Sequence, residues 1–378
     1  MTLIAVPNEI GPGDRRTAMT PGNVGKLTAA GAEVLVEAGL GAGCGFPDEQ
    51  YRAAGARVTG ERSELLAAAD LLLRIHKPAA GEIAQLKKGA IHISYLDPFN
   101  EQGLIEELRA GQITAISMEM IPRTTRAQKM DALSSQASLA GYVMMIQAAG
   151  RLNRILPMMM TPSGTIKPAR VFIIGAGVAG LQAIATAKRL GARVTAFDTR
   201  AVVAEQVESL GAGFLKIDIG ETGQTDDGYA RQLTPEQLGR QQQGQADEIA
   251  RSDIVITTAQ VFGRKPPRLV SRAMVSSMQP GSVIVDMAAE TGGNVEGSVP
   301  GEVVELDGVT IIGSGNWAGQ VSRDASNMYS NNLFSLVEEY WHAERKSFEL
   351  DLADDILASC VITHAGEIVN SIILQHYA

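Results

Sequence analysis

The chain has 378 residues, of which 45% are hydrophobic and 20% charged, a composition typical of a globular protein long enough for two domains. Its formal net charge is −9. Because nucleic acid binding needs a basic face, we expect no nucleic acid partner. The two cysteines, Cys44 and Cys360, belong to no CxxC pair or metal-ligand cluster, so we expect buried or half-buried thiols in a reducing cytoplasm. The start, MTLIAVPNEI, lacks the features of a signal peptide.

The first third of the chain alternates short apolar strands with helical segments that glycines such as Gly31 and Gly55 close. Such alternation predicts a parallel sheet with helices on both faces. The expected strands cover residues 3–6, 33–37, 71–75, 90–95 and 114–118, and the expected helices cover 21–30, 48–54 and 103–109.

A long helix is expected from Ala132 to Arg154, stopped by Pro157. Residues 132–150 carry no charge, but the serines and glutamines among them are poorly tolerated in a hydrocarbon core. We therefore expect a buried helix that connects two domains, and no segment that spans a membrane.

A second strand series begins at residue 171, with expected strands at 171–174, 193–197, 214–216, 254–257, 282–286 and 310–312. Its first strand ends in a GxGxxG turn, Gly175-Ala176-Gly177-Val178-Ala179-Gly180, and a helical segment follows. Gly175 permits the tight turn, Gly177 lets the backbone approach a pyrophosphate, and Gly180 allows helix–strand packing. The helix N-terminus offers N–H groups and a positive dipole end to phosphates. Together these features predict a dinucleotide site.

An acidic residue, Asp198, ends the second strand of this series. A carboxylate there accepts hydrogen bonds from the adenosine ribose and repels a 2′-phosphate, which favours NAD(H) over NADP(H). Arg200 lies two residues further on and could favour a phosphate, which weakens that preference.

The predicted fold class is α/β, with two Rossmann-like domains built on parallel sheets. A helix at 331–345 is expected to return the chain to the first domain, where residues 358–368 add strand-like segments. The nucleotide-binding domain, 134–321, would thus be inserted into a discontinuous first domain, 1–133 and 322–378. The polar segment 221–245 is expected to be a mobile surface loop with one helical piece.

A dehydrogenase that acts on an alcohol or amine needs a proton acceptor, and His76, His92 and His364 are the candidates outside the C-terminal turns that hold His342 and His376. A structural role is favoured for His92, whereas either role fits His76. The sequence contains neither HExxH nor GxSxG, which excludes zincin and serine hydrolase sites of those types.

A dense polar cluster, residues 121–136, precedes the long helix and would face the nicotinamide end of a bound dinucleotide. Arg123 and Asp131 could form an ion pair that fixes the arginine. A polar loop in which Asp131 or Ser134 caps the helix explains the same residues equally well.

At this cluster the chain resembles proton-translocating NAD(P) transhydrogenase, specifically the soluble NAD(H)-binding domain I of its alpha subunit. The likeness covers residues 4–364 and is carried by the RxxxxQxxD pattern, by the glycine-rich segment, and by DGYA, GRKPPRLV and MQPGSVIVDMAAETGGN. Two stretches depart from the family pattern, Gln260-Val261-Phe262 and the segment around Trp317.

The resemblance implies roles for individual residues. Arg123, steadied by Asp131, would orient the nicotinamide carboxamide; Gln128 would reach the nicotinamide ribose and the partner's NADP(H), and Ser134 would contact the nicotinamide. Tyr229, beside Gly228, would belong to a mobile loop that closes over the nucleotide. The expected cofactor-binding set is completed by the glycine turn and its flanks: Gly175, Ala176, Gly177, Val178, Ala179, Gly180, Asp198, Thr199, Arg200 and Gln260. No metal is expected.

The resemblance further implies direct, reversible hydride transfer, of the Re/Si-specific type, from NADH on this chain to NADP+ on a beta subunit. Proton movement would occur through a separate membrane-spanning subunit, and those partners would hold a homodimer of this chain at the cytoplasmic face of the cell membrane. Alanine dehydrogenase shares the fold and the RRTAMTP pattern around Arg16, but its substrate-binding lysine and histidine align with His76 and Asp97. An alanine dehydrogenase-like enzyme and a non-catalytic NAD(H) sensor remain the alternatives.

Overall fold

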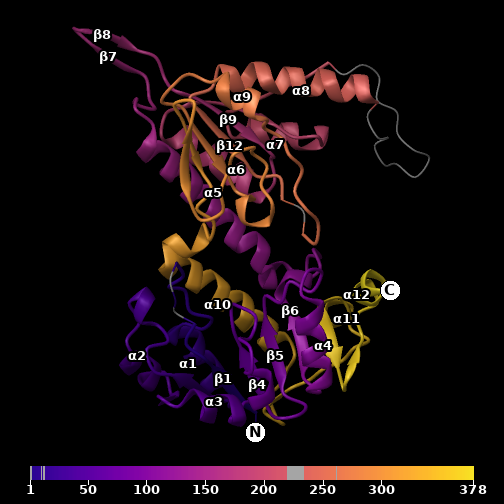
Figure 1. The fold of residues 1–378 in the computed structure, drawn as a ribbon. Coiled ribbons are helices and arrows are strands. Elements are labelled where there is room, and N and C mark those ends of the chain that lie inside the picture. The colour runs from indigo at the N-terminus through magenta and orange to yellow at the C-terminus, as the bar shows by residue number, and fades with distance from the viewer. Residues whose placement is uncertain (1, 10, 12, 219–233, 261) are drawn as a thin grey trace. The chain divides into compact units, whose positions relative to one another are not determined.

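The computed structural model describes residues 2–9, 11, 13–218, 234–260 and 262–378 (Figure 1). The chain folds into two compact units: unit 1 comprises Met1–Gln136 and Ala318–Ala378, and unit 2 comprises Ala137–Trp317. Unit 2 is therefore inserted into the sequence of unit 1. The expected boundaries, after residues 133 and 321, lie three and four residues from these limits.

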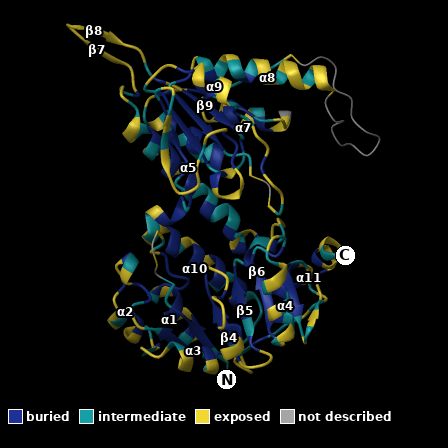
Figure 2. Cartoon of the chain, in the orientation of Figure 1, coloured by how far each residue is buried: buried dark blue, intermediate teal, exposed yellow. Residues whose placement is uncertain are grey.

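Unit 1 is built on an eight-stranded sheet in the order β19-β18-β6-β5-β4-β1-β2-β3. Its strands from β6 to β3 run parallel, whereas β18 pairs antiparallel with both β6 and β19. Central strands such as β4 are apolar and buried throughout, as expected for a sheet covered on both faces (Figure 2). The strands are β1 (Leu3–Val6), β2 (Glu33–Glu37), β3 (Arg57–Thr59), β4 (Leu71–Leu73), β5 (Ile91–Ser94), β6 (Thr114–Ser117), β18 (Val361–His364) and β19 (Glu367–Ile368).

The helices of unit 1 include one whose expected limits, 331–345, were wrong. Helix α10 begins nine residues earlier, at Ser322, and ends at Glu339, before a short hairpin of β16 (Trp341–His342) and β17 (Ser347–Phe348). Its first half hides from hydrophobic patterning because it buries hydroxyls: Ser326 and Ser330 accept hydrogen bonds from the Thr17 and Thr20 N–H groups at 2.9 and 3.0 Å. The helices are α1 (Pro21–Ala29), α2 (Asp48–Ala53), α3 (Arg62–Ala68), α4 (Gln102–Ala110), α10 (Ser322–Glu339), α11 (Asp355–Cys360) and α12 (Ser371–Tyr377).

Unit 2 contains a seven-stranded sheet in the order β11-β10-β9-β12-β13-β15-β14, parallel except for the antiparallel edge strand β14. Strands β9 and β12 are neighbours although helices α6, α7 and α8 separate them in sequence, so the strand order reverses at this pair. The elements are β9 (Arg170–Ile174), α6 (Val178–Arg189), β10 (Arg193–Phe197), α7 (Ala204–Ser209), β11 (Gly213–Phe214), α8 (Pro235–Ala250), β12 (Ile254–Thr257), α9 (Arg272–Ser276), β13 (Val283–Asp286), β14 (Val303–Leu306) and β15 (Val309–Ile312).

Helix α5 (Ala132–Arg151) begins in unit 1 and continues into unit 2, three residues shorter than expected. Inside unit 2 it lies against α6, where a Cβ atom added to Gly141 would stand 2.1 Å from the Ala179 carbonyl oxygen. Within the described part of the chain, no helix combines the length and the apolar character needed to cross a membrane.

Two further segments complete unit 2. A hairpin of β7 (Met159–Thr161) and β8 (Gly164–Ile166), which the sequence did not predict, is exposed along its length (Figure 2). Of the polar segment 221–245, the helical piece is confirmed: α8 begins at Pro235 with a capping box between Thr234 and Gln237. Residues 221–233, including the expected loop, lie outside the described residues.

Candidate functional site

The glycine-rich turn follows β9 at the point where the strand order of unit 2 reverses, the place where open α/β sheets bind ligands. Gly175 adopts φ +102°, and a Cβ atom there would stand 2.4 Å from Thr258 Oγ1. A Cβ atom on Gly180 would stand 1.9 Å from the Gly175 carbonyl oxygen. Both glycines are therefore required by the protein's own backbone and packing.

Gly177 is different, because a Cβ atom there would meet no atom within 4 Å. Its backbone is extended, with φ −79° and ψ −165°, which an alanine also adopts, and it precedes the first turn of α6. The next residue, Val178, is 42% exposed. The open space at the helix N-terminus fits a phosphate group, since free N–H groups and the helix dipole both favour an anion there.

Asp198 lies after β10 and closes the glycine turn. Its carboxylate accepts hydrogen bonds from the Ala176 N–H at 2.8 Å and from the Arg200 N–H at 2.9 Å, and pairs with the Arg200 guanidinium at 3.0 Å. Burial acts to raise the pKa of Asp198, but these hydrogen bonds hold that pKa below its ordinary value. Arg200 is therefore engaged by the acid itself.

Thr258, which follows β12, supports the turn from behind and was missed by sequence reasoning. Its hydroxyl donates to the Gly175 carbonyl oxygen at 3.1 Å. Nearby, the fully buried Asp286 accepts from the Asn294 N–H, and the Asn294 side chain donates to the carbonyl oxygens of Ala259 and Pro267. The MAAETGGN stretch thus orders the segment after β12, where Gln260 is exposed.

Thr199, also predicted to bind cofactor, is exposed beside Asp198. Ala176 and Ala179 are buried within the turn and contribute only backbone to its surface. Gly228 and Tyr229 lie outside the described residues.

The polar loop of residues 121–131 belongs to unit 1. The proposed ion pair between Arg123 and Asp131 is absent among the described residues. Asp131 instead caps α5, since its carboxylate accepts from the Ser134 N–H at 2.9 Å and from the Ser134 hydroxyl at 2.6 Å. An acid just before a helix satisfies otherwise unpaired N–H groups, which explains why it turns to the helix.

This loop is fixed at its base and presents polar side chains outward. Ala127 and Met130 are completely buried, and Asn332 of α10 donates to the Lys129 carbonyl oxygen at 2.9 Å. Arg123 and Gln128 are exposed. The structure thus provides a rigid mount for two side chains that are not used by the fold.

The histidine and cysteine predictions have mixed outcomes. His92 is fully buried, and burial lowers its pKa to about 3, so it is a neutral structural residue. Its Nε2 atom lies 2.9 Å from Ser94 Oγ, whereas its Nδ1 atom has no partner among the described residues. His364 contacts Thr114 Oγ1 at 3.0 Å. Cys44 and Cys360 are free, buried thiols, as expected. No cluster of metal-ligating side chains occurs in the described ranges.

The positions that a keto-acid dehydrogenase would use are engaged in other contacts. His76 Nε2 lies 3.0 Å from an Asp14 carboxylate oxygen, and Lys77 forms an ion pair with Glu101. Asp97 accepts a hydrogen bond from the Asn100 side chain at 2.9 Å. Neither a free lysine nor a free histidine therefore occupies the two aligned positions.

The sequence matches two family descriptions that together cover most of the chain: "Alanine dehydrogenase/PNT, N-terminal domain" over residues 5–140 and "Alanine dehydrogenase/PNT, C-terminal domain" over residues 144–371. The first of the parts that make up the alpha subunit of NAD(P) transhydrogenase in Rhodospirillum rubrum is 41% identical, over 97% of each chain. Alanine dehydrogenase from Mycolicibacterium smegmatis is 28% identical, over 99% of this chain and 96% of that protein.

A solved transhydrogenase structure from Sinorhizobium meliloti superposes with a TM-score of 0.87 at 43% identity, covering 97% of this chain and 100% of the other. The fold, the glycine turn and these similarities agree. The chain belongs to the alanine dehydrogenase/PNT family and, within it, to the alpha subunits of NAD(P) transhydrogenase.

Proposed function

We propose that this chain binds NAD(H) and passes hydride directly and reversibly between it and NADP(H) held by a partner subunit. The observation that carries the cofactor assignment is Gly177, a glycine that neither the backbone conformation nor the packing of the protein requires. A pyrophosphate that approaches this residue explains it. Bound NADH supplies the hydride, and the chain supplies binding, orientation and exclusion of water.

We further propose that the cofactor is NAD(H) rather than NADP(H). The Asp198 carboxylate stands at the end of β10, where it would meet the adenosine ribose, and would repel a 2′-phosphate. Arg200 forms a side-chain ion pair with that same carboxylate at 3.0 Å, so its charge is already compensated. On cofactor binding, the ribose hydroxyls would replace the Ala176 N–H as partners of Asp198.

Arg123 and Gln128 are proposed to position the nicotinamide ring, while Asp131 and Ser134 set the start of α5 beneath them. Hydride transfer between two nicotinamides removes no substrate proton, so this arrangement needs no general base. What it needs is alignment, and a rigid loop with two exposed polar side chains meets that need. Gly228 and Tyr229 are proposed to belong to the closing loop.

We propose that the partners are an NADP(H)-binding beta subunit and a membrane-spanning subunit that couples the transfer to proton movement, with this chain as a homodimer at the cytoplasmic membrane face. The R. rubrum relative is named as one portion of an alpha subunit, which supports a division of the whole enzyme into several chains.

Stopped-flow mixing of the NADH-loaded chain with an NADP+-loaded partner domain tests the proposal. Rapid NADH oxidation with stoichiometric NADPH formation is expected. Arg123→Ala should reduce the rate about 10²-fold or more with a small change in NADH affinity, because misplacement by about 1 Å already has an effect of that size. Arg126→Ala is the matched control, since Arg126 lies in the same loop but pairs with Asp354 at 2.7 Å. Equal rates for both variants, or no transfer with a competent partner, would refute the assignment.

A further inference from the structure

Unit 1 has its own reversal of strand order, and a buried arginine lies beside it. Strands β1 and β4 are neighbours at this point, with β2 and β3 on one side and β5 and β6 on the other. The loop after β1 carries Asp14 and Arg16, and His76 follows β4. The carboxyl ends of strands at such a reversal form a ligand-binding position. The proposed hydride transfer makes no use of these residues.

Arg16 is only 8% exposed and its guanidinium is held on two sides. Its Nε atom lies 3.1 Å from both carboxylate oxygens of Asp14, and its Nη2 atom lies 2.6 Å from Asp14 Oδ2. Its Nη1 atom donates to Gln136 Oε1 at 2.9 Å, and Gln136 in turn donates to the Ala325 carbonyl oxygen. This two-point contact is the geometry in which arginine binds the carboxylate of a small ligand.

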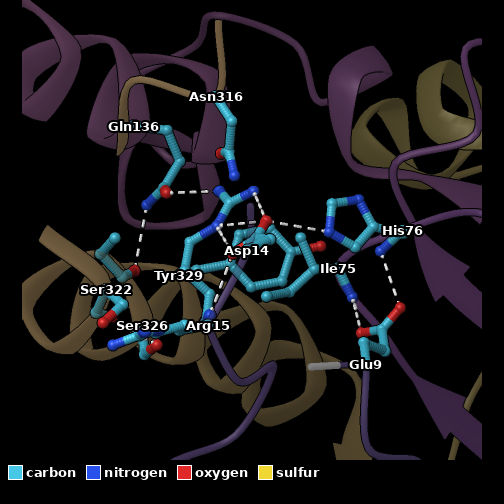
Figure 3. A network of polar contacts seen from close by, with 12 residues as sticks. Glu9, Asp14, Arg15, Ile75, His76, Gln136, Asn316, Ser322, Ser326 and Tyr329 are labelled. Atoms are coloured by element: carbon cyan, nitrogen blue, oxygen red, sulfur yellow. Dashed lines mark hydrogen bonds and ion pairs between the residues drawn. The ribbon is translucent and has the colours of Figure 1, made fainter. Parts of the chain in front are cut away.

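Asp14 is placed by its own loop to make this contact. Its backbone pairs with Gly11 through two hydrogen bonds, and its carboxylate also accepts from the Arg16 N–H at 3.0 Å. Figure 3 shows the Asp14 side chain directed at the His76 ring, whose Nε2 atom lies 3.0 Å away. Although burial opposes the charged form, hydrogen bonds from His76 and Arg16 hold the pKa of Asp14 far below its ordinary value. The carboxylate therefore stays ionised and bound.

We propose that Asp14 fills, from within the chain, a carboxylate-binding site formed by Arg16, Gln136 and His76, and so closes unit 1 to small carboxylic acids. Beyond its Cα atom, an aspartate side chain has the same heavy atoms as acetate. Removal of that side chain would leave a space of acetate's size in front of a buried, uncompensated guanidinium. The inference goes beyond the proposed hydride transfer and does not depend on it.

Chemical rescue of Asp14→Ala in the full chain tests this proposal. Acetate, at about ten times its dissociation constant, should raise the thermal unfolding midpoint of the variant by about 3–6 °C more than equal chloride. The wild-type chain should show no such difference. If Asp14→Ala does not fold alone, the readout is its refolding yield in acetate relative to chloride.

Three controls locate the effect. The double variant Asp14→Ala/Arg16→Met should lose the response to acetate, and Asp14→Asn should lack it because the amide fills the same space. Glu106→Ala removes the partner of the half-exposed Arg109 elsewhere in unit 1 and should not respond either. If Asp14→Ala responds no more than the wild type, or if the response survives loss of Arg16, the proposal is wrong.

Discussion

The glycines of the turn offer a sharp separation between the needs of the fold and the needs of a ligand. Gly180→Ala would place a Cβ atom 1.9 Å from the Gly175 carbonyl oxygen, so backbone must move. Overpacking of this kind destabilises by about 1–3 kcal/mol, which lowers the unfolding midpoint by about 2–12 °C for a domain of this size. Gly177→Ala meets no atom within 4 Å, so its effect on stability should stay within about 0.5 kcal/mol.

The order is reversed for NADH binding if the pyrophosphate approaches Gly177. We expect Gly177→Ala to weaken NADH binding at least about tenfold, which corresponds to about 1.4 kcal/mol, while the unfolding midpoint stays near the wild-type value. Titration by NADH fluorescence and calorimetric melting measure both quantities on one preparation. Gly239→Ala is the control, because that glycine of α8 also has open space at its Cβ position. Wild-type NADH affinity in a folded Gly177→Ala protein would refute the reasoning.

Three further predictions concern titratable groups. In the unfolded chain the pKa of His92 is about 6.5, and burial lowers it to about 3 in the folded protein, so the unfolded state binds more protons between these values and stability is lost as pH falls through that window. At pH 4.5 the loss is about 2–3 kcal/mol, and urea unfolding of His92→Gln should show a correspondingly weaker pH dependence; identical profiles would contradict this. Burial raises the pKa of the Cys360 thiol to about 12, so neither Cys360 nor the buried Cys44 should react with a thiol reagent at pH 8 until denaturant is added. Asp198→Ala should weaken NADH binding and raise the ratio of NADPH to NADH affinity by freeing Arg200, and an unchanged ratio of the two dissociation constants would argue against the role given to this pair.

Much of the fold was predictable because local patterns and tertiary packing agree. Strands β1, β2, β10 and β12 have the limits expected from their apolar runs, since a buried strand of a parallel sheet must be apolar throughout. The glycine turn was likewise readable, because its spacing reflects contacts within about ten residues.

Helix α10 shows where that approach ends. Its first turns carry serines whose hydroxyls are buried against the loop after β1, so their polarity is compensated by partners about 300 residues away. Thr258 was invisible for the same reason, since its value lies in a hydrogen bond to Gly175 across neighbouring strands.

Sequence alone therefore determined the strand–helix alternation, the dinucleotide turn and the family, all of which depend on residues close together in the chain. Only the tertiary structure decided that Asp131 caps α5 instead of pairing with Arg123, that Arg200 is engaged by Asp198, and that Arg16 is matched by Asp14. The physical reason is that each of these side chains has several chemically suitable partners. The three-dimensional placement of the backbone selects one of them.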